Sequence, residues 1–170
     1  MQKQNKNIKY IKILSFLLIL LWMLCVYALS NQSSINSSKQ SGHVIQIIIN
    51  ILPNTKFLTQ VEKIKLITSM QHVIRKLAYF MLYTIGGISI LNYAVFCDKI
   101  KKKVAFSIIL GALYCVTDEI HQLFIPGRSC EIKDMLIDSS GVIFGMLIVL
   151  AIFKIINWRN VNEKKDVSNC

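Results

Sequence analysis

Residues 104–128 read VAFSIILGALYCVTDEIHQLFIPGR, an apolar run that closes on two carboxylates and a histidine. No Asp, Glu, Lys or Arg occurs from Val104 until Asp118, and the run to Ile125 has about the length that a helix needs to cross a bilayer. A charged group at the centre of a bilayer costs about 2.5–3.5 kcal/mol, so ionisable residues inside a span are a functional hypothesis by default. The segment therefore predicts a transmembrane helix whose last turns carry a polar site.

Three further apolar segments of similar length put the chain in the membrane class. The protein has 170 residues, of which 54% are hydrophobic and 17% charged, and its mean hydropathy is +0.49. This composition is too apolar for an ordinary soluble domain and leaves room for one compact membrane domain, residues 1–170. We expect an all-α, polytopic protein, a four-helix transmembrane bundle with spans at Ile11–Leu29, Leu77–Phe96, Val104–Ile125 and Met135–Phe153.

Basic residues beside these spans predict the orientation. They gather in the N-terminal arm, in the turn between the second and third spans, and in the tail. Because Lys and Arg favour the cytoplasmic side, we expect a multi-pass protein of the cell membrane with both termini in the cytoplasm. The net charge of +11 then reflects orientation and attraction to anionic lipid, and no nucleic-acid partner is expected. The residues concerned are Lys3, Lys6, Lys9, Lys12, Lys99, Lys101, Lys102, Lys103, Lys154, Arg159, Lys164 and Lys165.

The first span has a second interpretation. Its basic start, its apolar middle and the small residue Ala28, with Val26 two positions earlier, also resemble a cleavable signal peptide. The apolar run is longer than the usual core of such a peptide, which favours a retained span.

The outward loop, residues 30–76, carries structure of its own. Residues 30–34 and 36–38 are polar and turn-like, whereas Val44–Leu52 is apolar but too short to span, which indicates an interfacial or re-entrant segment. Thr59 and Glu62 have the spacing of a capping box, and apolar residues follow at roughly helical spacing. We expect an amphipathic helix that lies on the outer surface and leads into the second span.

The last turns of the third span carry four polar side chains. Asp118, His121 and Gln122 are spaced at i+3 and i+4, so they share one helix face, and Glu119 shares an edge with Gln122. The Pro-Gly pair at 126–127 then breaks the helix at the outer surface.

Charged residues of the neighbouring segments are expected at the same depth. Arg128 follows the helix break, and Asp134 and Asp138 lie at i and i+4 at the start of the fourth span. Arg75 and Lys76 enter the second span. Polar groups from three spans should therefore meet just below the outer membrane surface.

Two interpretations of this cluster stand side by side. In the first, Arg128 and Arg75 neutralise the carboxylates of the cluster and fasten the bundle, as polar bonds between membrane helices do. In the second, the cluster binds a polar headgroup, a cation or a cell-envelope precursor. The concentration of costly groups favours a functional role, and both interpretations can hold at once.

Metal and cofactor chemistry finds little support. Asp118, Glu119, His121 and Asp138 are legitimate ligands for zinc, but the motif DEIH is not HExxH and no second histidine is close in sequence. The chain has no P-loop or nucleophile elbow, and its five cysteines form no CxxC pair. We therefore expect no metal and no cofactor, although buried carboxylates leave general acid–base chemistry open.

Gly141 and Gly145 form a GxxxG pattern in the fourth span. Such a pattern lets two helices approach closely, and we expect packing within the bundle rather than dimerisation. Gly86, Gly87 and Gly111 are interpreted in the same way.

Residues 118–145, DEIHQLFIPGRSCEIKDMLIDSSGVIFG, resemble the hallmark segment of the VanZ-like family of bacterial membrane proteins. The order of Asp-Glu, Gln, Pro-Gly-Arg, the two later Asp residues and Gly141 fits that segment. Residues 30–34 (SNQSS) and 75–78 (RKLA), with Tyr83, match more weakly, so the resemblance covers most of the chain. One departure stands out: the family typically has His where this chain has Tyr79, and a phenol carries no positive charge near neutral pH.

The resemblance implies a role at the cell envelope. The family is named for a member associated with low-level resistance to teicoplanin, a glycopeptide antibiotic that acts there. It also brings residues of the second span into the predicted site, which comprises Asp118, Glu119, His121, Gln122, Arg128, Asp134, Asp138, Lys76, Tyr79 and Tyr83.

Three functions remain open at the level of sequence. The first is a non-enzymatic factor that binds an envelope lipid, a precursor or the glycopeptide drug and lowers antibiotic susceptibility. The second is a membrane-embedded enzyme that acts on a lipid-linked envelope precursor. The third is a small transporter or accessory subunit, which with four spans would need to form oligomers. Membrane lipids are expected partners in all three.

Overall fold

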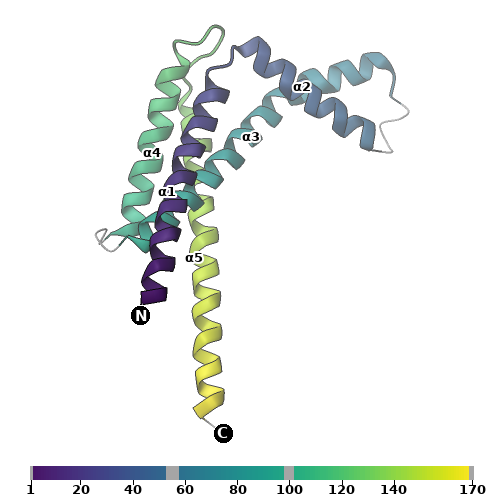
Figure 1. Cartoon of the computed structure of the whole chain (residues 1–170). Helices are drawn as coiled ribbons and strands as arrows, with labels where there is room; N and C mark the ends of the chain where they lie inside the picture. Colours follow the sequence, from purple (N-terminus) through teal and green to yellow (C-terminus); the bar gives the residue numbers. More distant parts are fainter. Residues whose placement is uncertain (1, 53–57, 98–101, 169–170) are drawn as a thin grey trace.

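Helices account for nearly all of the computed structural model, which describes residues 2–52, 58–97 and 102–168. Within these ranges the chain forms no strand. Figure 1 shows the order of the elements, and the all-α class predicted from the sequence is confirmed. The helices are α1 Gln2–Ser30, α2 Ser34–Ile51, α3 Gln60–Phe96, α4 Lys103–Gln122 and α5 Ile132–Ser168.

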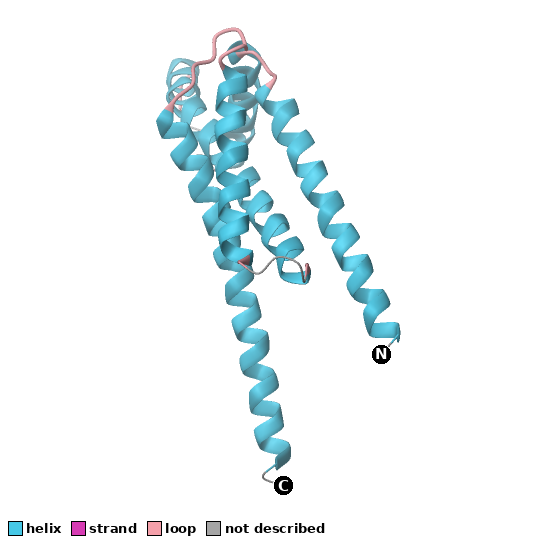
Figure 2. Cartoon of the chain, turned by 90° about the vertical axis from the view of Figure 1, so that its left-hand side faces the viewer, coloured by secondary structure: helices cyan, strands magenta, loops and turns pink. Residues whose placement is uncertain are grey.

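Four of these helices are long and apolar enough to cross a membrane, as the sequence predicts. The candidate spans are Ile8–Ser30, Gln60–Phe96, Lys103–Gln122 and Ile132–Arg159. In Figures 1 and 2, α1, α4, α5 and the second half of α3 run side by side, with both termini at one end. The turn between α4 and α5 lies at the opposite end, called the distal end below. Lys99 and Lys101, part of the predicted orientation signal, lie outside the described residues.

The contact between α3 and α5 is the most extensive in the bundle, and glycines make it possible. A Cβ atom at Gly145 would lie 2.1 Å from the carbonyl oxygen of Thr84, and one at Gly141 would lie 2.5 Å from that of Phe80. These contacts are with backbone, so any larger side chain would push the helices apart. The GxxxG pattern thus serves packing within the bundle, which confirms the prediction.

Helix α1 packs into the same core through Trp22. The indole lies over Gly86, where a Cβ would come within 2.2 Å of the ring, and its centroid is 4.8 Å from that of Tyr114. The Tyr114 hydroxyl donates a hydrogen bond of 2.7 Å to the carbonyl oxygen of Met23. The small residue on α3 therefore admits a large aromatic side chain from α1.

Helix α2 and the first half of α3 form an arm that leaves the bundle sideways at the distal end (Figure 1). The prediction that residues 36–38 form a turn is wrong, because these residues belong to α2. The Ser33 hydroxyl caps this helix by accepting from the backbone N–H of Asn36 at 3.4 Å. Ser37 and Ser41 are buried, and their small side chains suit the contact between α2 and α3.

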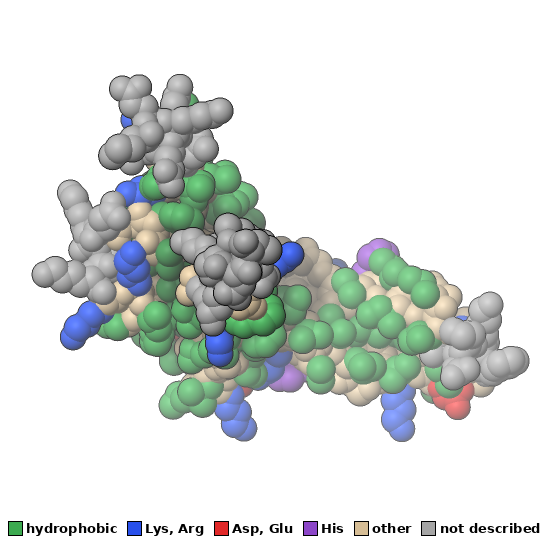
Figure 3. Space-filling model, turned by 90° about the horizontal axis from the view of Figure 1, so that it is seen from below, with side chains coloured by type: hydrophobic (Ala, Val, Ile, Leu, Met, Phe, Trp, Pro, Cys, Tyr) green, Lys and Arg blue, Asp and Glu red, His purple; other side chains and the backbone are tan. Residues whose placement is uncertain are grey.

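The apolar segment 44–52 comprises the last part of α2 and its C-cap Leu52 rather than a separate re-entrant element. The capping box at the start of α3 is confirmed: Thr59 and Glu62 bond each other's backbone N–H groups. Hydrophobic side chains gather on the underside of the arm, the side from which the bundle extends (Figure 3). The arm therefore has the amphipathic character predicted for the outer loop, with exposed apolar residues that include Val44, Ile47, Ile48, Ile51, Val61, Ile64 and Val73.

The turn at the distal end is longer than predicted. Helix α4 ends at Gln122, three residues before the expected end, because the next amides bond three residues back, as Phe124 N–H does to His121 at 3.0 Å. Gly127 adopts φ +74°, a conformation that favours glycine, and reverses the chain toward α5. The carbonyl oxygen of Pro126 accepts from the N–H of Ser34 at 3.3 Å, which ties this turn to the arm.

Candidate functional site

Asp118, near the distal end of α4, is the acceptor at the centre of the predicted cluster. Its side chain is 5% exposed, and its Oδ2 atom accepts hydrogen bonds from three other helix positions. Ser30 Oγ donates at 2.9 Å, Tyr83 OH at 3.2 Å and Gln122 Nε2 at 3.2 Å. A buried carboxylate with three neutral donors is well satisfied without a direct cation.

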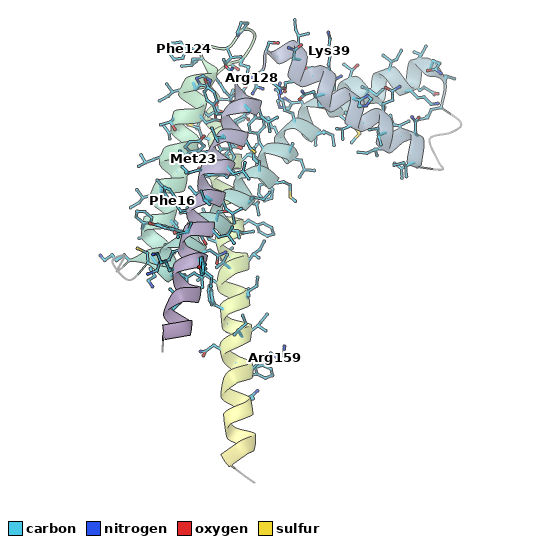
Figure 4. The ribbon with its side chains drawn as sticks, viewed as in Figure 1. Phe16, Met23, Lys39, Phe124, Arg128 and Arg159 are labelled. Atoms are coloured by element: carbon cyan, nitrogen blue, oxygen red, sulfur yellow. The ribbon has the colours of Figure 1, made fainter. Side chains whose placement is uncertain are left out.

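Arg128 is the principal donor of the same cluster. Its Nη1 donates to the hydroxyl of Tyr79 and to Oε1 of Gln122, both at 3.1 Å. The rest of the guanidinium bonds the carbonyl oxygens of Gln32 at 2.9 Å and Leu29 at 3.2 Å. The planar fork of an arginine suits such a set of divergent acceptors. Figure 4 shows Arg128 at the distal end, far along the molecule from Arg159.

These contacts form a closed ring of hydrogen bonds in which both paths run, donor to acceptor, from Arg128 to Asp118. The Ser30 hydroxyl, which donates to Asp118, lies 3.3 Å from the Tyr79 hydroxyl and so accepts from it. One path of hydrogen bonds runs from Arg128 through Tyr79 and Ser30 to Asp118, and the other runs through Gln122. We call these five residues the Asp118–Arg128 ring. It couples a cation to a carboxylate through neutral groups and ties together α1, α3, α4 and the distal turn.

Arg128 and Arg75 do not neutralise the cluster through direct ion pairs, as one interpretation of the sequence expected. No carboxylate lies within ion-pair distance of either guanidinium among the described residues. The reason is geometric: Arg128 is held by neutral acceptors, and Arg75 contacts Nδ1 of His72 at 3.3 Å. Lys76 is the cation that pairs directly, with Asp134 and, at 3.9 Å, with Glu131.

A cavity of about 60 Å³ opens beside the ring, between α3, α4, α5 and the distal turn. It has room for a few water molecules or a small polar group. Charged side chains line much of it, and we call it the distal cavity. Its lining comprises Arg75, Lys76, Tyr79, Glu119, Gln122, Gly127, Arg128, Ser129, Glu131, Asp134, Ile137 and Asp138.

Two buried carboxylates face this cavity. Glu119 is 1% exposed, and its Oε2 accepts from the backbone N–H of Glu131 at 3.1 Å. Asp138 is 3% exposed, and its carboxylate accepts no hydrogen bond from the described residues. The Asp138 carboxylate is therefore open to a ligand or a water molecule in the cavity. The described residues offer no group of three or more His, Cys, Asp or Glu side chains arranged to hold a metal ion.

His121 does not join the other predicted residues. Its ring turns toward α1 and lies against Tyr27, with centroids 5.1 Å apart. Its Nε2 atom is buried and has no hydrogen-bond partner among the described residues. His121 thus contacts α1, as Asp118 does through Ser30, but it does not line the distal cavity.

Two residues of the site were not in the predicted set. Ser30 is fully buried and donates a hydrogen bond to Asp118. The Glu131 side chain accepts a hydrogen bond from Ser129 and pairs with Lys76, and its backbone N–H donates to Glu119. For Ser30 the signal in the sequence was the weak match of residues 30–34 to the VanZ-like family. For Glu131 only its place between the two acidic helix ends could have indicated a role.

Comparison with known proteins adds one finding at the level of the family. A model of the family described as VanZ/LLP1 matches residues 15–154, which contain the Asp118–Arg128 ring and the distal cavity. Neither a curated protein nor a solved structure matches the chain.

Proposed function

The chain belongs to the VanZ/LLP1 family, and from this premise we propose that it is a cell-envelope factor that binds an envelope lipid, a lipid-linked precursor or a glycopeptide drug at the distal cavity. By this binding it lowers susceptibility to glycopeptides such as teicoplanin, in keeping with the member that gave the VanZ-like family its name. We also propose that residues 1–170 form a single membrane domain.

The observation that carries the proposal is the distal cavity with the Asp138 carboxylate in its lining. Asp138 is buried and faces a space in which it has no hydrogen-bond donor among the described residues. The surrounding ring holds Arg128 and Tyr79 in fixed positions on another wall of the same cavity. Fixed polar groups around a small cavity are the usual design of a specific binding site.

The proposed orientation puts this cavity outside the cytoplasm. Both termini lie at the end opposite the cavity. Lys9 and Lys12 belong to the N-terminal half of α1, and Lys154 and Arg159 belong to the C-terminal half of α5. Positive residues favour the cytoplasmic side, so the distal end would face the envelope, where glycopeptides and precursors are found.

The test is teicoplanin susceptibility of a Gram-positive host that expresses the wild-type protein, Asp138→Asn or Arg128→Ala at matched membrane levels. Wild type is expected to protect, and both variants are expected to lose protection. Asp138→Asn removes a negative charge from the cavity, and Arg128→Ala removes a side chain that lines it. Arg159→Ala is the matched control, since this arginine lies far from the cavity and is expected to protect as wild type does.

Two outcomes would contradict the proposal. If wild type reaches the membrane in folded form and gives no protection, the link to glycopeptides fails. If Asp138→Asn protects as fully as wild type, protection arises elsewhere than in the distal cavity.

A membrane-embedded enzyme is the second candidate, and one observation favours it. Glu119 and Asp138 bring two buried carboxylates to the same cavity, as general acid–base chemistry on a lipid-linked precursor would require. Expression would then change the profile of lipid-linked precursors, and Glu119→Gln would abolish the change. An unchanged profile in cells that are nevertheless protected would favour binding alone.

A further inference from the structure

A second cavity adjoins the distal cavity and has the opposite character. It has a volume of about 160 Å³, lies where the arm meets the bundle and is mostly apolar. Helices α1, α2 and α3 line it, with Leu29, Val44, Ile74 and Ala78 among the apolar residues. We call it the arm groove. Because these apolar side chains make up most of its surface, the groove has the chemistry of a site for a hydrocarbon chain.

The two cavities share a wall. Arg75 and Tyr79 line both, and they lie at i and i+4 on one face of α3. A molecule with one polar and one apolar end could therefore occupy both cavities across these two residues. Neither cavity alone would hold such a molecule, since one is small and charged and the other is apolar.

The charges of the distal cavity indicate the kind of polar end. Arg75 has no carboxylate partner among the described residues, so its guanidinium is available for an anion such as a phosphate. Asp138 has no donor, so it is available for a group that carries N–H bonds and a positive charge. Lys76 also lines the cavity, but it is not available for an anion, because it already forms ion pairs with Asp134 and Glu131.

We propose that the distal cavity and the arm groove together bind a membrane phospholipid whose headgroup bears a primary ammonium group, as in phosphatidylethanolamine. The ammonium faces Asp138, with Glu119 beside it, the phosphate faces Arg75, and an acyl chain enters the arm groove. This inference rests on the proposed function, because it names the ligand of the same distal cavity.

The test is native mass spectrometry of the full chain, purified in detergent and titrated with three phospholipids that share dioleoyl chains. Phosphatidylethanolamine offers N–H donors, phosphatidylcholine carries the same charge without them, and phosphatidylglycerol has no ammonium. We expect phosphatidylethanolamine to bind about tenfold more tightly than either of the others, as one charge-assisted hydrogen bond would give.

Three variants test the three parts of the site. Asp138→Asn is expected to abolish the preference for phosphatidylethanolamine, and Arg75→Gln to weaken all three lipids alike, with Arg159→Gln as its control. Val44→Trp is expected to block the arm groove and weaken all three lipids. Ile47→Trp is its matched control, because Ile47 lies on the same helix, is exposed to a similar degree (47% against 45%) and does not line the groove.

Equal binding of all three lipids to the wild-type protein would overturn the inference, as would a preference that survives in Asp138→Asn. Should Asp138→Asn fail to fold, the order of the three lipids on wild type still decides. Failure of the proposed function is distinguishable: lipid preference without protection from teicoplanin removes the resistance role alone, and protection without lipid preference removes this inference alone.

Discussion

At the scale of single residues, the contrast between Asp118 and Asp138 separates structure from function. Both carboxylates are buried in helices that cross the bundle, at 5% and 3% exposure. Asp118 accepts three hydrogen bonds, whereas Asp138 accepts none from the described residues. We therefore expect Asp118 to contribute to the stability of the distal end, and we propose Asp138 as the group that binds a ligand.

Asp118→Asn is expected to leave thermal stability nearly unchanged, whereas Asp118→Ala lowers the free energy of unfolding by about 1–3 kcal/mol. All three hydrogen bonds meet at Oδ2, so a single amide oxygen can accept them, but alanine leaves Ser30, Tyr83 and Gln122 unsatisfied. Thermal unfolding in detergent, followed by circular dichroism, measures both. Equal destabilisation by the two variants would show that the negative charge, rather than the acceptor, stabilises the bundle.

Tyr79→Phe is expected to lower the free energy of unfolding by about 0.5–1.5 kcal/mol. The change removes the hydroxyl that accepts from Arg128 and donates to Ser30, and so opens one of the two paths of the ring. Tyr27→Phe serves as the control, because Tyr27 is 52% exposed and its ring contacts His121 without a hydrogen bond through its hydroxyl among the described residues. The same unfolding assay applies, and an equal effect of both changes would contradict the role given to the ring.

At the scale of elements, α3 is the helix around which the others pack, since it contacts α1, α2, α4 and α5. Its first half belongs to the arm and its second half to the bundle, within one helix of 37 residues. Arg75, Lys76 and Tyr79 lie where one half passes into the other, which is why both cavities share residues of this helix. The place of the candidate site thus follows from the course of α3.

Gly145→Ala is expected to destabilise the protein by about 1–3 kcal/mol, because the new Cβ would lie 2.1 Å from the backbone oxygen of Thr84 and the helices must separate. Gly42→Ala is the matched comparison. Its Cβ would meet the end of the flexible Gln71 side chain at 2.8 Å, and alanine favours the helix, so stability should hold or rise slightly. Thermal unfolding of both variants decides, and a harmless Gly145→Ala would contradict the close contact of α3 and α5.

At the scale of the whole molecule, the even number of spans and the sideways arm define two different ends. The termini share one end, and the distal turn and the arm share the other (Figures 1 and 2). The apolar underside of the arm faces the side from which the bundle extends, as expected of a segment that rests on the membrane surface. This arrangement would put the opening of the distal cavity near the level of lipid headgroups.

The proposed orientation predicts the accessibility of single cysteines in a variant that lacks the natural ones. A membrane-impermeant maleimide added to intact cells should label Ser129→Cys, which lies exposed in the distal turn, and should spare Arg159→Cys. Permeabilised cells should show labelling of both. The reverse pattern in intact cells would place the distal cavity on the cytoplasmic side and remove the proposed contact with envelope precursors.

Sequence alone determined the fold class, the four spans and most members of the candidate site. Spans are encoded locally, because a helix that crosses a bilayer needs about 20 consecutive apolar residues. The capping box at Thr59 and Glu62 and the close packing of Gly141 and Gly145 were likewise predictable, since each depends on spacing within one helix. Family resemblance added Tyr79 and Tyr83, which periodicity would not have selected.

Tertiary structure alone decided which polar groups meet and which stay unpaired. The sequence could not show that Arg128 bonds neutral acceptors, that Lys76 rather than Arg75 pairs with Asp134, or that His121 turns to Tyr27. These choices depend on contacts between residues up to about one hundred positions apart, as between Leu29 and Arg128, and on a turn whose end no helical spacing fixes. The division into a bundle-tying ring and an open cavity follows from that arrangement, because helix faces set the direction of each side chain but not its partner.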